Sequence, residues 1–197
     1  MSMLDRPDNR VAGFVLKGQL AETALTRAMG TRTGGAEVSF HSISQRLSIK
    51  DLDAEAVTDA EKMSAVYIAI ASFENMVRKL ISDRLLEEKG ADWWKECVSV
   101  KIRDRADKKI KDEERIRWHG SRGLSAIYFT ELKDLPSIIQ QNWACFEDLL
   151  PNVEWVRHII TTIERSRHVI MHSGQLSLDD IERVGMNIRD WMHQVGS

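Results

Sequence analysis

Cysteine is scarce in this sequence, and its two copies are not arranged as in a cross-linked or metal-binding fold. Cys97 and Cys145 are far apart in 197 residues, and no Cys-x-x-Cys pair occurs. Small disulfide-dependent domains carry more cysteines, and structural zinc modules need closely spaced thiols. We therefore expect neither a disulfide framework nor a zinc module, and a reducing cytoplasm is the expected location.

Long apolar runs and a strong charge of one sign are also missing. No stretch approaches the roughly 20 apolar residues of a membrane-spanning helix, and the segment Met1–Arg6 lacks the apolar core of a signal peptide. We expect no membrane contact. The net charge is −2, so no global basic field indicates nucleic acid. Any RNA contact must come from a local patch.

Strand patterns are rare, whereas apolar residues at the three-and-four spacing of helices recur after residue 58. The longest pattern predicts a helix from Thr58 to Glu88, because Thr58 and Glu61 form a capping-box signature and Gly90 supplies a stop. Further helices are predicted over 100–117, from Thr130 to Asn142, over 153–171 and over 178–194, with a short one opening at Asp92. The pattern predicts an all-α, up-and-down helical bundle over 58–197.

The first 57 residues are less regular, and we interpret them as an N-terminal appendage. Residues 15–29 could form one helix, followed by a glycine-rich break. The apolar residues of 37–49 fit no single period, so this part is expected to be a short strand or an irregular packing arm.

One stretch near the end, Glu164–Gly174, places two arginines and two histidines at the end of a predicted helix. Arginine keeps its charge and histidine titrates near neutrality, which suits phosphate chemistry. Arg167 and His172 are five steps apart, or roughly 140° around a helix, so they do not share a face. A site using both needs a loosened helix end or a second copy across a dimer axis. Arg165, seven steps before His172, does stack near it.

A simpler interpretation is that these cations decorate a solvated helix end, where they suit the dipole. Two other segments also leave alternatives open. The loop 118–123 has two glycines, a histidine and an arginine that could hold a phosphate. The helix over 100–117 has mixed charges typical of a solvated face, with a basic RNA-tracking face as the alternative. No nucleotide fingerprint or metal-ligand spacing is present, so no cofactor and no metal is expected.

Several stretches occur in a recognisable order along the chain: Ala69–Arg78, Trp93-Trp94, Arg117–Gly120, Tyr128–Leu135, Ile139–Trp143, Arg167–His172 and Arg189–Trp191. This ordered set resembles the HEPN superfamily, in particular the HEPN domain at the C-terminus of the eukaryotic messenger-RNA surveillance endonuclease, which also occurs in prokaryotic proteins. The resemblance covers about residues 60–195.

The resemblance implies a helical homodimer that brings two Arg-x4-6-His helix ends together. It implies a metal-independent endoribonuclease with Arg167 and His172 as the catalytic pair. The 2′-hydroxyl of RNA would be the nucleophile, and the product would carry a 2′,3′-cyclic phosphate. Many members act in antiphage defence or toxin–antitoxin systems, so an antitoxin or defence-system protein is an expected partner.

The resemblance also assigns supporting positions. Members often carry asparagine directly after the arginine, where this chain has His168, and polar residues on an earlier helix that faces the site. Some members have lost activity, so a non-catalytic module that binds RNA or a partner protein remains the alternative. On solely local grounds, the polar residues of the earlier helix could instead face solvent or cap a neighbour. The supporting residues are His168, Glu74, Asn75 and Arg78.

Overall fold

The computed structural model describes residues 39–116 and 118–196 of the chain. These residues are mostly helical and contain no strand, which confirms the all-α prediction. The chain divides into two units between Leu52 and Asp53, and each is described separately. The helix predicted over 15–29 lies outside the described residues.

The described part of the first unit consists of helix α2 (Phe40–Arg46) and the 3₁₀ helix η1 (Ile49–Asp51). The side chain of Ser39 accepts a hydrogen bond from the backbone N–H of Ser42 at 3.2 Å and caps α2. The expectation of a strand or irregular arm over 37–49 is therefore wrong. The helix forms because a serine cap satisfies its first turn, although the apolar residues lack a clear period.

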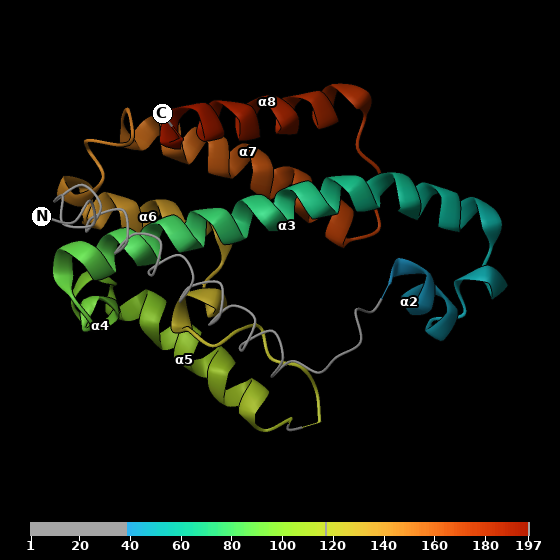
Figure 1. Cartoon of the computed structure of the whole chain (residues 1–197), viewed down its shortest axis with the longest axis horizontal. Helices are drawn as coiled ribbons and strands as arrows, with labels where there is room; N and C mark the ends of the chain where they lie inside the picture. The colour runs from blue at the N-terminus through green and yellow to red at the C-terminus, as the bar shows by residue number, and fades with distance from the viewer. Residues whose placement is uncertain (1–38, 117, 197) are drawn as a thin grey trace, which may run out of the picture. The chain divides into compact units, whose positions relative to one another are not determined.

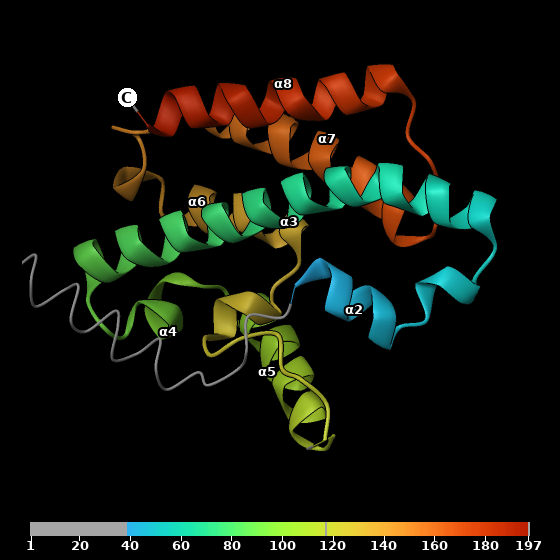
Figure 2. The same ribbon diagram turned by 45° about the vertical axis from the view of Figure 1, so that its right-hand side comes forward.

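In the second unit, α3, α7 and α8 run in alternating directions, as an up-and-down bundle requires (Figures 1 and 2). Helix α7 packs against α8, α6 and α3, and this arrangement confirms the predicted bundle. The elements are α3 (Ala54–Lys89), α4 (Trp93–Cys97), α5 (Val100–Glu114), η2 (Ala126–Phe129), η3 (Leu132–Asp134), α6 (Leu135–Gln141), η4 (Trp143–Cys145), α7 (Val153–Met171) and α8 (Leu178–Val195).

Helix α3 begins one turn before the predicted start. The Asp53 carboxylate accepts a hydrogen bond from the backbone N–H of Ala56 at 2.9 Å and caps the helix. Thr58, the predicted cap, lies inside the helix, and its hydroxyl donates to the carbonyl of Ala54 at 2.8 Å. The predicted stop is confirmed, since Gly90 ends α3 with a φ of 80° that favours glycine.

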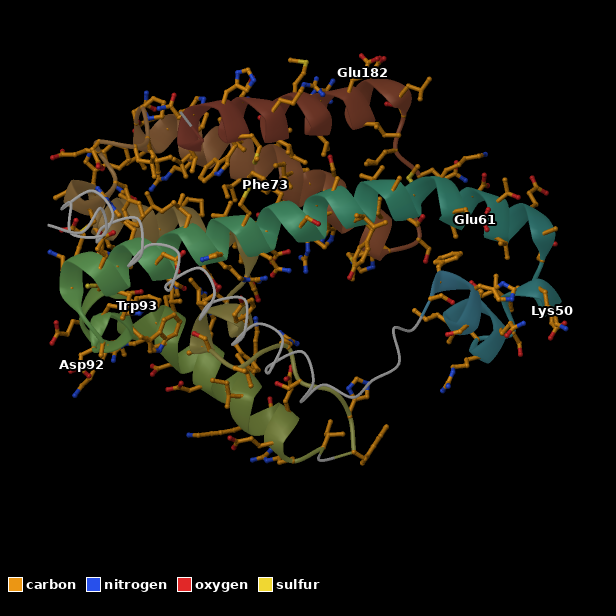
Figure 3. All side chains as sticks on the ribbon, in the orientation of Figure 1. Lys50, Glu61, Phe73, Asp92, Trp93 and Glu182 are labelled. Carbon is orange, nitrogen blue, oxygen red and sulfur yellow. The ribbon has the colours of Figure 1, made fainter. Side chains whose placement is uncertain are left out.

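The core lies between α3 and the pair α7 and α8. Phe73 of α3 meets the Trp191 ring of α8 edge to face at 5.5 Å, and Trp191 stacks on Trp155 of α7 at 5.5 Å. In Figure 3, Phe73 lies between α3 and α8, whereas Glu182 lies on the outer side of α8. The buried stripe of α3 consists of Val66, Ile70, Phe73, Val77, Ile81 and Leu85.

The segment before α6 differs from its prediction. Thr130 does not cap a helix, because its hydroxyl donates to the carbonyl of Ile127 at 2.7 Å and closes η2. Glu131 and Asp134 cap the short η3 reciprocally. The α-helix begins only at Leu135, where proline is tolerated in the first turn. The result is an irregular segment between α5 and α3 (Figure 1). It leaves the carbonyl of Thr130 available to accept a hydrogen bond from Arg78 of α3.

Candidate functional site

Helix α7 places Arg167 beside the core. The side chain of Asn152 caps the helix by accepting from the N–H of Trp155 at 2.7 Å. The buried face of α7 extends to Ser166, and Arg167 lies one turn after the buried Ile163 on nearly the same face. Its side chain is 39% exposed, so the guanidinium lies at the edge of the core, against α3.

The carboxylate of Glu74 on α3 joins two guanidinium groups. Glu74 is only 6% exposed. Its Oε1 atom lies 2.6 Å from Nη2 of Arg78, and its Oε2 atom lies 3.3 Å from Nε of Arg167. One buried anion therefore holds α3 and α7 together, and three of the predicted site residues lie in direct contact.

Arg78 is fixed from several sides. Its Nη2 atom also donates to the carbonyl of Thr130 at 3.1 Å, and its Nη1 atom donates to Oδ1 of Asn75 at 3.3 Å. Its guanidinium carbon lies 5.8 Å from the centroid of the Tyr128 ring. Burial lowers the pKa of Arg78, the Glu74 carboxylate opposes that change, and the Arg167 charge adds to it. Arginine nevertheless stays cationic at working pH.

The end of α7 is a closed turn. His172 is the C-cap residue that follows Met171, and Ser173 adopts a left-handed φ of 61°. The N–H of Gly174 donates to the carbonyl of Val169 at 2.9 Å, as in a Schellman motif. A Cβ on Gly174 would lie 2.7 Å from Cγ1 of Val169, so the turn has no room for a larger residue. The predicted stop is present, and it fixes the backbone of His172.

The two histidines face each other instead of Arg167. The rings of His168 and His172 lie 4.6 Å apart between centroids, at 64°, and both residues are exposed. Within residues 39–116 and 118–196, Arg167 makes no hydrogen bond to His172. Arg165 is exposed. A single chain therefore brings Arg167 to Glu74 and His168 to His172, and no hydrogen bond or ion pair joins the two pairs within the described residues.

Beside Arg167 lies a groove of about 360 Å³. It contains Glu74, Asn75 and Arg78, so these predicted residues line one hollow with Arg167, whereas His168 and His172 lie outside its lining. Glu131 was not singled out from the sequence. Nothing in its sequence context marks it as a site residue, because a glutamate before a short turn looks like any other exposed acidic residue. The lining residues are Tyr67, Ala71, Glu74, Asn75, Arg78, Lys109, Arg122, Tyr128, Thr130, Glu131 and Arg167.

Glu131 is held in its charged form by two lysines. Its carboxylate lies 2.6 Å from Nζ of Lys133 and 3.2 Å from Nζ of Lys109. Hydrogen bonds from these lysines lower the pKa of Glu131 to about 2. The carboxylate is therefore ionised throughout the physiological range, and its negative charge is divided between two cations.

The region that contains these residues matches a known family. The model of the Swt1-like HEPN family matches residues 69–196 of the chain. The chain belongs to this HEPN family. No match was found among curated proteins or among solved structures. The HEPN match spans the second half of α3 through α8, and it includes Glu74, Arg78, Arg167 and both histidines of the α7 end.

Within the part of the HEPN protein that the structure describes, no group of three or more histidine, cysteine, aspartate or glutamate residues is placed to hold a metal ion. None of the helices in this part has both the length and the apolar character needed to cross a membrane.

Proposed function

We propose that this HEPN protein is a metal-independent endoribonuclease in which Arg167 and His172 form the catalytic pair. The observation that carries the proposal is the construction of the α7 end. Arg167 is held by a buried carboxylate at 3.3 Å, and the backbone of His172 is held by the closed turn at Ser173 and Gly174. Preorganised groups of this kind stabilise a charged transition state without reorganising.

The chemistry needs one proton acceptor, one proton donor and one cation. Neutral His172 would take the proton of the ribose 2′-hydroxyl, whose oxygen attacks the adjacent phosphorus. The bond from phosphorus to the 5′-oxygen breaks, and a protonated histidine gives that oxygen its proton. Arg167 would stabilise the negative charge of the phosphorane. The products are a 2′,3′-cyclic phosphate and a 5′-hydroxyl end.

A second copy of the chain completes the proposed site. Within one chain Arg167 contacts Glu74, whereas His172 contacts His168. A two-fold axis beside the α7 ends would bring Arg167 of one copy near His172 of the other, as the HEPN resemblance implies. The resemblance also suggests the setting, an antiphage or toxin–antitoxin system in the cytoplasm with a cognate partner protein.

The proposal is tested on the full-length protein with a labelled single-stranded RNA in excess EDTA. We expect cleavage that persists in the chelator and yields 2′,3′-cyclic phosphate ends. An oligonucleotide of the same sequence with deoxyribose should stay intact, because it lacks the attacking hydroxyl. Cleavage of both strands alike, or cleavage that EDTA abolishes, would contradict the mechanism.

One observation favours a second candidate, a non-catalytic HEPN module that binds RNA or a partner protein. Arg167 already has a carboxylate partner in Glu74, which neutralises part of the charge that catalysis would use. This candidate predicts that RNA or a partner protein is bound tightly while RNA is not cut under any condition tested.

A further inference from the structure

The groove beside Arg167 has an excess of positive charge. Its lining contains four cationic side chains and two carboxylates, in a chain whose net charge is −2. Each carboxylate already has two cationic partners. Glu74 pairs with Arg78 and Arg167, and Glu131 pairs with Lys109 and Lys133. Just outside the lining, Lys133 adds one cation and Glu113, the partner of Arg122, adds one carboxylate, so five cations face three carboxylates and an excess of two positive charges remains.

A neighbouring hollow shows that this excess is a feature of the groove and not of α5 in general. That hollow is lined by three acids and three bases, so its charges balance. Lys108 belongs to it, whereas the next residue, Lys109, faces the groove. The residues of the balanced hollow are Asp104, Asp107, Lys108, Lys111, Asp112 and Arg115.

The groove cations are fixed but still reach solvent. Arg122 is oriented by Glu113, whose Oε1 atom lies 2.7 Å from its Nε atom, and its side chain remains 52% exposed. The side chain of Lys109 is 27% exposed. Tyr67 is half exposed at the same groove and offers an aromatic face. Oriented cations beside an aromatic ring are the features that bind a single-stranded nucleic acid.

We propose that this groove binds the sugar–phosphate backbone of a single-stranded RNA next to the cleaved bond. Lys109 and Arg122 contact successive phosphates, and Arg167 is the residue shared by the groove and the catalytic pair. The inference rests on the proposed function for the identity of the ligand as RNA. It adds the path of the strand, which crosses from α7 past α3 to α5 and the loop before η2.

The test measures binding of a fluorescent single-stranded RNA to the full-length protein at several salt concentrations. The His172→Ala background keeps the RNA intact. Lys109→Gln and Arg122→Gln are each expected to lower the slope of log affinity against log salt by about 0.7, the value for one released phosphate contact on a single strand. A DNA strand of the same sequence should lose the same slope, because its phosphates are the same.

Lys108→Gln is the matched control, because it removes one charge from the same helix but faces the balanced hollow. Its slope should equal that of the parent. Lys109→Gln leaves Glu131 paired with Lys133, so the substitution strands no carboxylate. Equal slopes for Lys108→Gln, Lys109→Gln and Arg122→Gln would overturn the proposal. Polyglutamate tests an acidic protein as the ligand instead. If it displaces RNA from the His172→Ala parent more strongly than from both groove variants, while the slopes stay equal, the groove binds an acidic protein and the proposal is overturned.

The groove proposal and the nuclease proposal can be contradicted independently of each other. Uncut RNA with wild-type protein, together with reduced slopes for the groove variants, would leave the groove in place and remove the enzyme. Cleavage by wild-type protein with unchanged slopes would keep the enzyme and remove the groove. If both hold, the groove variants in the wild-type background should raise KM more than they lower kcat.

Discussion

Alanine in place of His172 is expected to lower the rate of RNA cleavage by about 100-fold to 10,000-fold, the range for losing a general acid or base. Alanine in place of Arg167 should lower it by about 100-fold to 1,000-fold, because the phosphorane loses a preorganised cation. His172 is exposed, so its replacement should change the free energy of unfolding little. Arg167→Ala removes one of the two cations paired with the buried Glu74, so it should lower the free energy of unfolding, but less than Glu74→Ala because Arg78 stays paired. Single-turnover cleavage rates and urea unfolding curves measure the two effects.

The same helix supplies the controls. Arg157 and His158 lie on α7 and are exposed, and Arg157 contacts Gln140 near the other end of the bundle. Arg157→Ala and His158→Ala remove one arginine and one histidine from α7 away from the proposed site, so the cleavage rate should stay within a few-fold of wild type. A nuclease equally active after Arg167→Ala and His172→Ala would remove this pair from the mechanism.

Alanine in place of Glu74 is expected to lower the free energy of unfolding by about 3–5 kcal/mol, the cost of breaking a buried ion pair by removing one partner. The substitution leaves the buried guanidinium of Arg78 without its carboxylate and releases Arg167 from α3. Chemical unfolding followed by tryptophan fluorescence reports the change, because Trp155 and Trp191 stack in the adjacent core.

Glu74→Gln is the informative companion to that variant. It keeps the shape of the side chain and one acceptor for Arg78, so the loss of stability should be smaller than for alanine. Cleavage should still fall, because a neutral amide holds Arg167 less firmly than a carboxylate. If Glu74→Ala unfolds within about 0.5 kcal/mol of wild type, as a surface substitution would, the buried bridge does not contribute as described.

The helical core was predictable because its signal is periodic. The apolar residues of α3 and α7 recur at helical spacing and are buried as that spacing requires. Helix starts were harder. Asp53 and Thr58 both carry side chains that cap helices. Because the residues between them are mostly good helix formers, the helix extends back to Asp53, which caps it. Thr130 failed as a predicted cap because its hydroxyl closes the preceding turn.

Placing the site residues depended on contacts between distant segments, which spacing cannot give. Glu74 on α3 and Arg167 on α7 are far apart in the sequence, yet they form an ion pair. A usable signal did exist, since Glu74 occupies the register of Ile70, Phe73 and Val77, the buried face of α3. A carboxylate on such a face needs a cationic partner, although the sequence does not say which one.

The central claim is that Arg167 of one copy acts with His172 of the other, and mixing two inactive variants tests it most directly. Arg167→Ala and His172→Ala proteins are combined, with subunit exchange verified by labels, and RNA cleavage is measured in EDTA. A mixed dimer retains one site with both wild-type residues, so the mixture should cleave RNA well above either variant alone. A fully exchanged mixture that remains as inactive as its two components would contradict the account.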